Sequence, residues 1–321
     1  MQNNDGDTRL LTKIASMYYI EELTQSQISK KMNLERSMIS RLLKKARSLG
    51  IVEISVHQEH SGLIDLEARL ESIFNLKEVI IVPETYNSLD STNNKLNIGK
   101  AAARYLDRII KDGDIVGLAL GTTMLSITNA LNDTKNVKSI FVPLVGGSDN
   151  NKIEYQVNII ASKFAESFGA EAQYISAPVV TTDKRTKEYL IQDASFTKVK
   201  SLWSQLDIAI VGIGAPIQSS NLIWTGAFGN KDIDLLNSKK AVGDILSRFY
   251  DIEGNIIYSE LDERIISLDL SLLKDIDFVI GVAESVEKAP SILGALRGKF
   301  INVLITSEST ARKILELNDS N

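Results

Sequence analysis

One short basic stretch carries the residue types that contact nucleic acid. Residues 23–50 read LTQSQISKKMNLERSMISRLLKKARSLG, in which seven Lys and Arg stand against one Glu, a net charge of +6. The whole chain has a net charge of −5, so the remainder carries −11. Cationic side chains neutralise phosphates, and residues near the start of a helix can read base edges in the major groove. The charge pattern therefore indicates a polyanionic partner for this segment alone.

Two short helices are expected to position these side chains. Thr24 and Gln27 match a capping box, and Leu23 and Ile28 occupy the positions of a hydrophobic staple. The first helix is expected to end near Asn33, and the second to begin around residues 35–37. This arrangement is typical of a helix-turn-helix.

The second helix has one apolar stripe and one basic face. Gly50 is expected to close it. The stripe is Ile39, Leu42, Leu43 and Ala46, and the outward positions include Arg47. The alternative is an ordinary solvated helix pair with a Lys-rich face. The predicted DNA-binding residues are Thr24, Gln25, Arg36, Ser37, Met38, Ser40, Arg41, Lys44 and Lys45.

The segments around this pair complete a predicted DNA-binding domain over residues 1–57. Residues 9–20 are expected to form a supporting helix after a frayed tail at 1–7. The alternating run 51–56 predicts a strand and hence a winged domain. Beyond the boundary, 63–76 has heptad-like spacing and could pack on the large domain or pair with a second subunit. Residues 83–97 are polar and predict a surface loop.

Residues 58–321 predict a second domain of α/β class. Apolar runs precede glycine-bearing loops and helices, at 115–120, 139–145, 207–214, 277–283 and 301–306. A long helix is expected at 153–168 and a small hairpin at 250–259. Near-continuous apolar strands alternating with helices predict a mostly parallel, Rossmann-like sheet covered on both faces.

Such sheets bind ligands beyond the carboxyl ends of their strands. Gly121, Thr122 and Thr123 follow the strand at 115–120 and offer two hydroxyls and a helix N-terminus, which suit a phosphate. The alternative is a tight turn in which Thr caps the helix. Gly212 and Gly214 do not continue into a dinucleotide fingerprint, so no cofactor is predicted.

Composition narrows the classes of function. The chain has no cysteine, which excludes disulfides and thiolate sites. Its only histidines, His57 and His60, lie close together just after the DNA-binding segment, and their position excludes a His-based metal site or a Ser-His-Asp triad in the large domain. No apolar run approaches the ~18–20 residues that span a bilayer, and MQNNDGDTR is not a signal peptide. We expect a cytoplasmic protein without a membrane partner.

These segments together resemble the SorC family of bacterial transcriptional regulators, from about Leu10 to the C-terminus. The motifs that carry the resemblance are YYIEELTQSQISKKMNLERSMISRLLKKAR, GLALGTTM, PLVGG, DIAIVGIGA, AVGDILSRFYDIEGN and KAPSILGALRGKFINVLITSESTARKIL. The resemblance implies a C-terminal domain related to sugar-phosphate isomerases and deaminases. It also implies a phosphorylated sugar as effector and assembly into homodimers or homotetramers.

The resemblance also implies roles for individual residues. The glycine and threonines at 121–123 would cradle the phosphate, two later glycines would let the backbone approach the sugar, and three side chains would contact the ligand. Each side chain has a plainer alternative as a turn cap, a solvated helix residue or a surface charge. The implied effector-binding residues are Gly121, Thr122, Thr123, Gly146, Gly147, Gln156, Asp244 and Lys288.

Two positions depart from the family pattern. Some members have a lysine before Gly-Gly that forms a Schiff base with a sugar aldehyde, and this chain has Val145 there. Many members have Gly-Gly after the strand at 277–283, where this chain has Glu284 and Ser285. The second change adds a negative charge near the predicted phosphate site and could re-aim the loop.

The leading hypothesis is a DNA-binding regulator of a carbohydrate-catabolism operon, controlled by a phosphorylated sugar. An alternative is a sugar-phosphate isomerase or deaminase fused to a DNA-binding head, with Asp244 and Glu284 as candidate carboxylates. Such chemistry needs an acid and base poised over the sugar, and no convincing pair is present. A third hypothesis is a DNA-binding scaffold without an effector, which the glycine-lined strand ends argue against.

Overall fold

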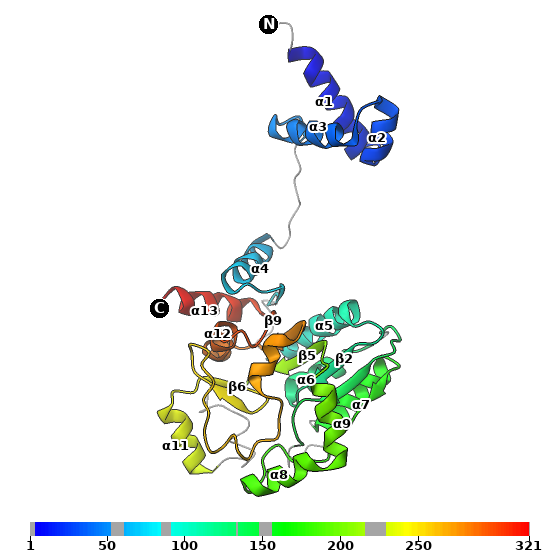
Figure 1. The fold of residues 1–321 in the computed structure, drawn as a ribbon. Helices are drawn as coiled ribbons and strands as arrows, with labels where there is room; N and C mark the ends of the chain where they lie inside the picture. Colours follow the sequence, from blue (N-terminus) through cyan, green and yellow to red (C-terminus); the bar gives the residue numbers. More distant parts are fainter. Residues whose placement is uncertain are drawn as a thin grey trace. The chain divides into compact units, whose positions relative to one another are not determined.

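The chain forms two compact units, Met1–Glu59 and His60–Asn321, in a computed structural model (Figure 1). The structure describes residues 4–52, 61–84, 91–132, 134–147, 156–215 and 229–320. The division falls two residues after the predicted boundary at 57/58, and both positions belong to 53–60, outside the described residues.

Residues 4–52 of the first unit form a bundle of three helices. They are α1 (Asn4–Tyr19), α2 (Gln25–Met32) and α3 (Arg36–Ser48). Ile14, Ile28 and Ile39, one from each helix, are fully buried in a shared core. The predicted tail at 1–7 was wrong from Asn4 onward, because α1 already includes these residues. Most of the strand expected at 51–56, and with it the wing, lies outside the described residues.

The second unit contains a parallel sheet with seven strands among the described residues, in the order β1-β9-β8-β5-β2-β3-β4. All six strand pairings are parallel. The five apolar runs found in the sequence supply β2, β3, β5, β8 and β9, whereas β1 was not predicted and β4 is a two-residue edge strand too short to predict. The strands are β1 (Glu78–Val82), β2 (Ile115–Leu118), β3 (Ile140–Pro143), β4 (Glu171–Ala172), β5 (Ile208–Gly212), β8 (Phe278–Val282) and β9 (Val303–Ser307).

Helices connect these strands. They are α4 (Ser61–Phe74), α5 (Ser91–Ile109), α6 (Thr122–Thr128), α7 (Val157–Ser167), α8 (Lys184–Gln192), α9 (Ala194–Trp203), α11 (Asn230–Ser238), α12 (Ala289–Arg297) and α13 (Glu308–Asp319). Two short 3₁₀ helices, η3 (Leu270–Asp275) and η4 (Val286–Lys288), lie before β8 and α12. The helix expected at 153–168 corresponds to α7, which spans the narrower range Val157–Ser167.

The surface loop predicted at 83–97 was wrong from residue 91, where α5 begins. Its first turns are polar and rich in Asn, which lowers intrinsic helix propensity. Ile98, Ala102 and Leu106 nevertheless form a fully buried stripe at four-residue spacing. Burial of this stripe against β1 and β9 outweighs the weak propensity of the polar start.

Helix α4 packs on its own unit, which is the first of the two alternatives left open by its spacing. Leu66 and Leu70 are buried in the main core. Glu67 Oε1, also on α4, accepts from the Ile81 N–H, and Glu71 Oε1 accepts from the Val79 N–H, both at 2.8 Å. The two carboxylates thus cover N–H groups along the edge strand β1, which would otherwise be free to pair with another chain.

A small antiparallel hairpin, β6 (Gly243–Ile245) and β7 (Arg248–Tyr250), stands beside the large sheet (Figure 1). Its two turn residues, Leu246 and Ser247, have φ values of 55° and 62°. Such turns favour Asn-Gly, so this backbone is strained. The hairpin expected at 250–259 is confirmed by the antiparallel bridge between Tyr250 and Ile256.

Candidate functional site

The start of α2 is fixed by the predicted capping box. The Gln27 N–H donates to Thr24 Oγ1 at 3.3 Å, and the Thr24 N–H donates to Gln27 Oε1 at 2.8 Å. Asn33 ends the helix with a left-handed φ of 52°. Thr24 is exposed and Gln25 is half-buried. The start of α2 is therefore fixed by local hydrogen bonds, and its end by the left-handed Asn33.

Helix α3 separates an apolar side from a basic side. Ile39, Leu43 and Ala46 are buried, as the sequence predicted, and Leu42 is half-buried. No ion pair neutralises Arg36, Arg41 or Lys44 within residues 4–52, the part of this unit that is described. Exposed residues on the other side are Arg36, Ser37, Met38, Arg41, Lys44 and Lys45, with Ser40 half-buried. This face can present cations and hydroxyls to a phosphate backbone and base edges.

Arg47, which the sequence also placed outward, has a partner within the bundle. Its Nε donates to Tyr19 Oη at 2.9 Å, and its guanidinium lies 5.9 Å from the centre of the Tyr19 ring. This contact joins the end of α3 to the end of α1. We therefore assign Arg47 a packing role and leave the basic face to the residues before it.

The second unit has a cavity of about 260 Å³ at the carboxyl ends of its central strands. It is bounded by the ends of β2 and β5, by Val145, by the β6–β7 turn and by η4. Five of the eight predicted effector residues line it: Gly121, Thr122, Thr123, Asp244 and Lys288. Gly212, Gly214, Leu246 and Ser247 also line it, and sequence reasoning did not assign them to the site.

The turn after β2 leaves backbone donors available. Gly121 precedes α6 with a φ of 115°, a conformation that a side chain would strain, and it supplies no side-chain cap. The N–H groups that follow it are therefore free of a side-chain cap within the described residues. Thr122 Oγ1 accepts from Lys95 Nζ at 2.8 Å. The turn thus combines N–H donors, hydroxyls and an ammonium group, a combination that suits an anion.

Asp244 is the buried carboxylate of the cavity, with 6% of its surface exposed. Its Oδ2 accepts from the Ser247 N–H at 3.1 Å across the hairpin turn. Burial raises the pKa of Asp244 to about 6, although the Ser247 N–H and the Lys288 ammonium act in the opposite direction. A Cβ atom on Gly214 would lie 1.8 Å from Asp244 Oδ1, so only glycine permits this approach.

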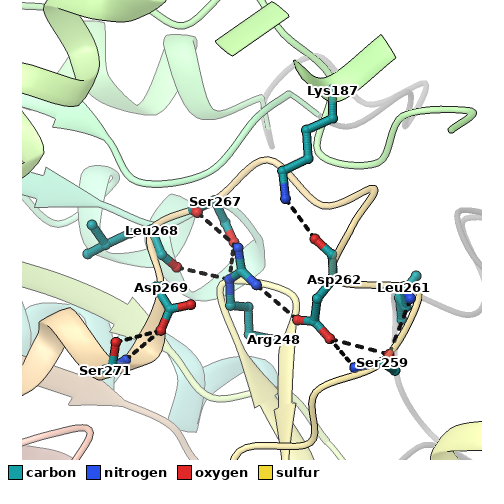
Figure 2. Close-up of polar contacts among 9 residues, drawn as sticks. All are labelled: Lys187, Arg248, Ser259, Leu261, Asp262, Ser267, Leu268, Asp269 and Ser271. Atoms are coloured by element: carbon teal, nitrogen blue, oxygen red, sulfur yellow. Dashed lines mark hydrogen bonds and ion pairs between the residues drawn. The ribbon is translucent and has the colours of Figure 1, made fainter. Parts of the chain in front are cut away.

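The hairpin that carries Asp244 is held by a buried guanidinium (Figure 2). Arg248 is 7% exposed, and its Nη1 donates to Asp262 Oδ1 at 2.9 Å. Its Nε donates to Ser267 Oγ at 3.1 Å. Lys187 Nζ donates to the Asp262 carbonyl at 2.7 Å. Because Val145 on the cavity wall bridges Ser267, this network fixes the hairpin against the cavity.

Lys288, which also lines the cavity, supplies a partly buried cation. Its Nζ donates to the Ile213 carbonyl at 2.9 Å. Burial lowers the pKa of Lys288, and the nearby Lys95 ammonium lowers it further, while Asp244 and Glu284 act to raise it. The cavity is therefore lined by the charged residues Asp244, Glu287 and Lys288, and the Lys95 ammonium lies within electrostatic reach of Lys288.

The remaining three predicted residues do not line this cavity in the described part of the chain. A Cβ on Gly146 would lie 2.3 Å from the Pro178 carbonyl oxygen, so this glycine serves close backbone packing. The Gly147 N–H donates to the Ala177 carbonyl at 2.8 Å. Gln156 is the N-cap residue of α7 and lies beside Gly147. Residues 148–155 between them are outside the described residues.

A larger cavity of about 470 Å³ lies between α8, α9 and η3. Its wall is mainly apolar and includes Phe196, Trp203 and Leu272. None of the predicted residues lines it. The smaller, polar cavity is therefore the candidate functional site of this unit.

Two classes of feature are absent from the described ranges. No helix among them is long and apolar enough to cross a membrane. No three His, Asp or Glu side chains among them are grouped so that they could hold a metal ion.

Comparison with known proteins also divides the chain into these two units. Residues 58–316 match the family described as "Putative sugar-binding domain", and residues 12–48 match "Sigma-70, region 4". The sorbitol operon regulator of Klebsiella pneumoniae is 34% identical over 98% of this chain and 100% of its own length. The deoxyribonucleoside regulator of Bacillus subtilis is 33% identical, over 96% of this chain and 97% of its own.

Solved structures of other transcriptional regulators are similar to this chain as well. The full-length sorbitol operon regulator SorC from Klebsiella pneumoniae has a TM-score of 0.73 at 32% identity, covering 97% of this chain and all of that one. A transcriptional regulator from Streptococcus pneumoniae has a TM-score of 0.77 at 29% identity, covering 82% of this chain and all of that one. The matched relatives are named as transcriptional regulators, not as enzymes. This chain therefore belongs to the SorC family of DNA-binding transcriptional regulators with a sugar-binding domain.

Proposed function

We propose that this protein regulates a carbohydrate-catabolism operon and that a phosphorylated sugar, bound in the 260 Å³ cavity, controls it. One observation carries the proposal. Thr122, Asp244 and Lys288 come from distant parts of the sequence and line one cavity at the strand ends. Hydroxyls and an ammonium group suit a phosphate, and a buried carboxylate suits sugar hydroxyls. The relatives that regulate sorbitol and deoxyribonucleoside genes support the same class of effector.

The proposed ligand contacts follow from the walls of the cavity. The Gly121–Thr123 turn and Lys288 hold the phosphate, and Asp244 accepts hydrogen bonds from the sugar hydroxyls. Gly146, Gly147 and Gln156 stay in the proposal only as neighbours of the site, since they do not line the cavity. Val145 has no amine, so the sugar binds without a covalent bond to that position.

The proposed DNA contacts lie on α3 and the start of α2. Arg36, Ser37, Met38, Ser40 and Arg41 lie in the major groove, near the start of the helix, where base edges are reached. Thr24, Gln25, Lys44 and Lys45 contact the phosphate backbone. Two copies in a homodimer, or four in a homotetramer, would bind half-sites about 34–36 Å apart or at multiples of that distance. The protein acts in the cytoplasm, where its DNA lies.

An enzyme built on the same fold is the second candidate, and the site does not favour it. Asp244 already accepts from the Ser247 N–H. The other candidate, Glu284, does not line the cavity. Proton transfer over a sugar needs two groups within hydrogen-bond reach of it. Turnover of a sugar phosphate by the purified protein would overturn this judgement.

The proposal is tested with a panel of sugar phosphates and the matching free sugars. We expect one or more phosphorylated members to raise the melting temperature, with an increase in stability of about 2.7 kcal/mol at ~100 times the dissociation constant. The free sugar should act far more weakly. A panel in which no phosphorylated member stabilises the protein would contradict the proposed effector class.

A further inference from the structure

The larger cavity, of about 470 Å³, has the size and the walls of a small-molecule site. Phe196 and Trp203 form an edge-to-face pair on its wall, with ring centres 5.5 Å apart. The Trp203 Nε1–H donates to the Pro143 carbonyl at 2.8 Å, so the indole is held in place and has no donor left for a ligand. Leu272 on the wall is 48% exposed, so the cavity reaches the surface and a ligand can enter it. The other apolar residues of the wall are Ile191, Leu206, Ile265, Ile266 and Ile276.

The charged residues of this lining balance one another. Lys187 and Asp269 are half-buried, and Lys200 and Asp275 are exposed. Lys187 Nζ already donates to a backbone carbonyl at 2.7 Å, and Asp269 Oδ1 already accepts from the Ser271 N–H at 2.9 Å. A lining without net charge, whose half-buried ionic groups are bonded within the chain, favours neither an anion nor a cation. The walls therefore suit an uncharged, mainly apolar molecule.

A short backbone ladder joins this cavity to the smaller one. Residues 144–146 pair with residues 266–268 through an antiparallel bridge between Val145 and Ser267 and backbone hydrogen bonds of 2.8 and 2.9 Å on either side of it. Val145 lines the smaller cavity, and Ser267 lines the larger one. A change in the position of Ser267 is therefore transmitted directly to the wall of the smaller cavity.

Ser267 also holds Arg248, the side chain that fixes the β6–β7 hairpin (Figure 2). Its Oγ accepts from Arg248 Nε at 3.1 Å, and its carbonyl accepts from Arg248 Nη2 at 3.3 Å. Arg248 directly follows the turn of this hairpin, and Asp244 lies on the preceding strand. A ligand that contacts Ser267 in the larger cavity therefore acts on the hairpin that carries Asp244.

We propose that the larger cavity is a second ligand site, which binds an uncharged, mainly apolar small molecule and is coupled through Ser267 and Arg248 to the hairpin of the smaller cavity. The site itself stands on its own walls, whereas its effect on the effector rests on the proposed function and deepens it. A ligand that fits the cavity favours the arrangement of Ser267 that it binds best. It thereby holds the hairpin more firmly and raises the affinity for the effector, and the effector raises the affinity for this ligand by the same factor.

The site is tested with N-phenyl-1-naphthylamine, an uncharged apolar fluorophore, and the full-length protein. We expect saturable binding of about one probe per chain. Leu272→Trp and Ser204→Trp, two larger side chains at exposed positions of the lining, should each weaken it on the order of tenfold, because they occupy the space of the ligand. Ile64→Trp, at a 50% exposed position on α4, is the matched control. Unsaturable binding, or equal affinity in all these proteins, would overturn the site.

A second copy of the chain is the alternative occupant of such a cavity. Light scattering distinguishes it, because Leu272→Trp and Ser204→Trp would then lower the mass of the assembly. That result would overturn the ligand site. An unchanged mass together with weakened probe binding supports it, and retained DNA binding reports that each variant is folded.

The coupling is measured by hydrogen exchange of the hairpin, which needs no sugar phosphate. Saturating probe should slow amide exchange in residues 243–250 at least about fivefold, the lower end of typical coupling between sites, and should leave α13 unchanged. Ser267→Ala removes the hydroxyl that accepts from Arg248 Nε, and most of this slowing should be lost. Hairpin exchange that saturating probe does not change in the wild type would overturn the coupling.

The results distinguish this inference from the proposed function. If no sugar phosphate raises the melting temperature while the probe binds and slows hairpin exchange, the second site stands and the proposed effector fails. If a sugar phosphate stabilises the protein but the probe does not bind, the proposed function stands and this inference fails. Where both bind, a sugar phosphate that leaves the affinity for the probe unchanged would overturn the coupling to the effector.

Discussion

The basic face of α3 and the strand-end cavity use polar residues under opposite conditions. On α3 the cations are exposed, and no ion pair within the described part of that unit neutralises Arg36 or Arg41. In the cavity, Asp244 and Arg248 are buried and hydrogen-bonded. An exposed charge contributes little to the free energy of folding. A buried charge costs desolvation energy, and removing its partner destabilises the protein strongly. Variants of the face should therefore change binding alone, and variants of the cavity should change both binding and stability.

The largest effect is expected from Arg248→Met. Removing the guanidinium leaves Asp262, whose side chain is only 16% exposed, without its ion-pair partner. We expect a loss of about 3–5 kcal/mol in the free energy of unfolding, the usual result of breaking a buried pair. Chemical denaturation measures it. Arg312→Met, which breaks an exposed ion pair within α13, is the control and should lose less than about 0.5 kcal/mol. Equal losses of unfolding free energy in the two variants would contradict the distinction between buried and exposed charges.

Asp244→Asn should gain stability while it loses effector affinity. The folded protein raises the pKa of Asp244 to about 6, so wild-type stability falls as pH rises through that value. The amide has no such cost, and its advantage should grow from pH 4 to pH 7 to at most about 3 kcal/mol. Melting curves across this range test it. A stability difference that is constant with pH would contradict the assignment of a buried, ionised carboxylate.

Arg41→Ala should weaken DNA binding by about 1–3 kcal/mol without changing the melting temperature, because the side chain is exposed. Gel-shift titration against DNA fragments that the protein enriches from a random pool measures this. Arg104→Ala, exposed on α5, is the control. If both variants bind DNA as the wild type does, the basic face has been placed on the wrong residues.

The smallest effect is expected from Ser285→Gly. Ser285 has a φ of 104°. Relief of a left-handed φ at a non-glycine residue is worth ~1–3 kcal/mol, and glycine's entropy in the unfolded chain takes back about 0.5–1 kcal/mol. We therefore expect a net gain of about 1 kcal/mol. Ser204→Gly, at a φ of −80°, should lose stability. Destabilisation by Ser285→Gly would show that the side chain contributes more than the backbone costs.

The two regions also differ in how far the sequence could predict them. The capping box at Thr24 and the stripe of α3 are local patterns, and the structure confirms both. Five strands were also predictable, because continuous apolar runs mark buried parallel strands. The resemblance to the family, more than spacing, brought Asp244 and Lys288 into the predicted set, and both line the cavity.

What could not be predicted depends on tertiary contacts. Lys95 lies in a segment that was predicted to be a loop. The sequence did not indicate a helix there, because this helix is stabilised by burial and not by intrinsic propensity. Leu246 and Ser247 form a turn that their residue types disfavour, so no turn signal marked the hairpin. Gly214 gave a weak glycine motif whose reason, the close approach of Asp244, appears only in three dimensions.

The central claim is that an effector in the strand-end cavity controls DNA binding by the basic face. It is tested most directly by titrating the enriched DNA with wild-type protein and with Asp244→Asn, each with and without the sugar phosphate that most raises the melting temperature. The account predicts that the sugar phosphate shifts the DNA affinity of the wild type at least fivefold, the lower end of typical allosteric coupling of ~1–3 kcal/mol. It predicts that Asp244→Asn binds DNA equally well and does not respond. A wild type whose DNA affinity is unchanged by a sugar phosphate that it binds would contradict the account.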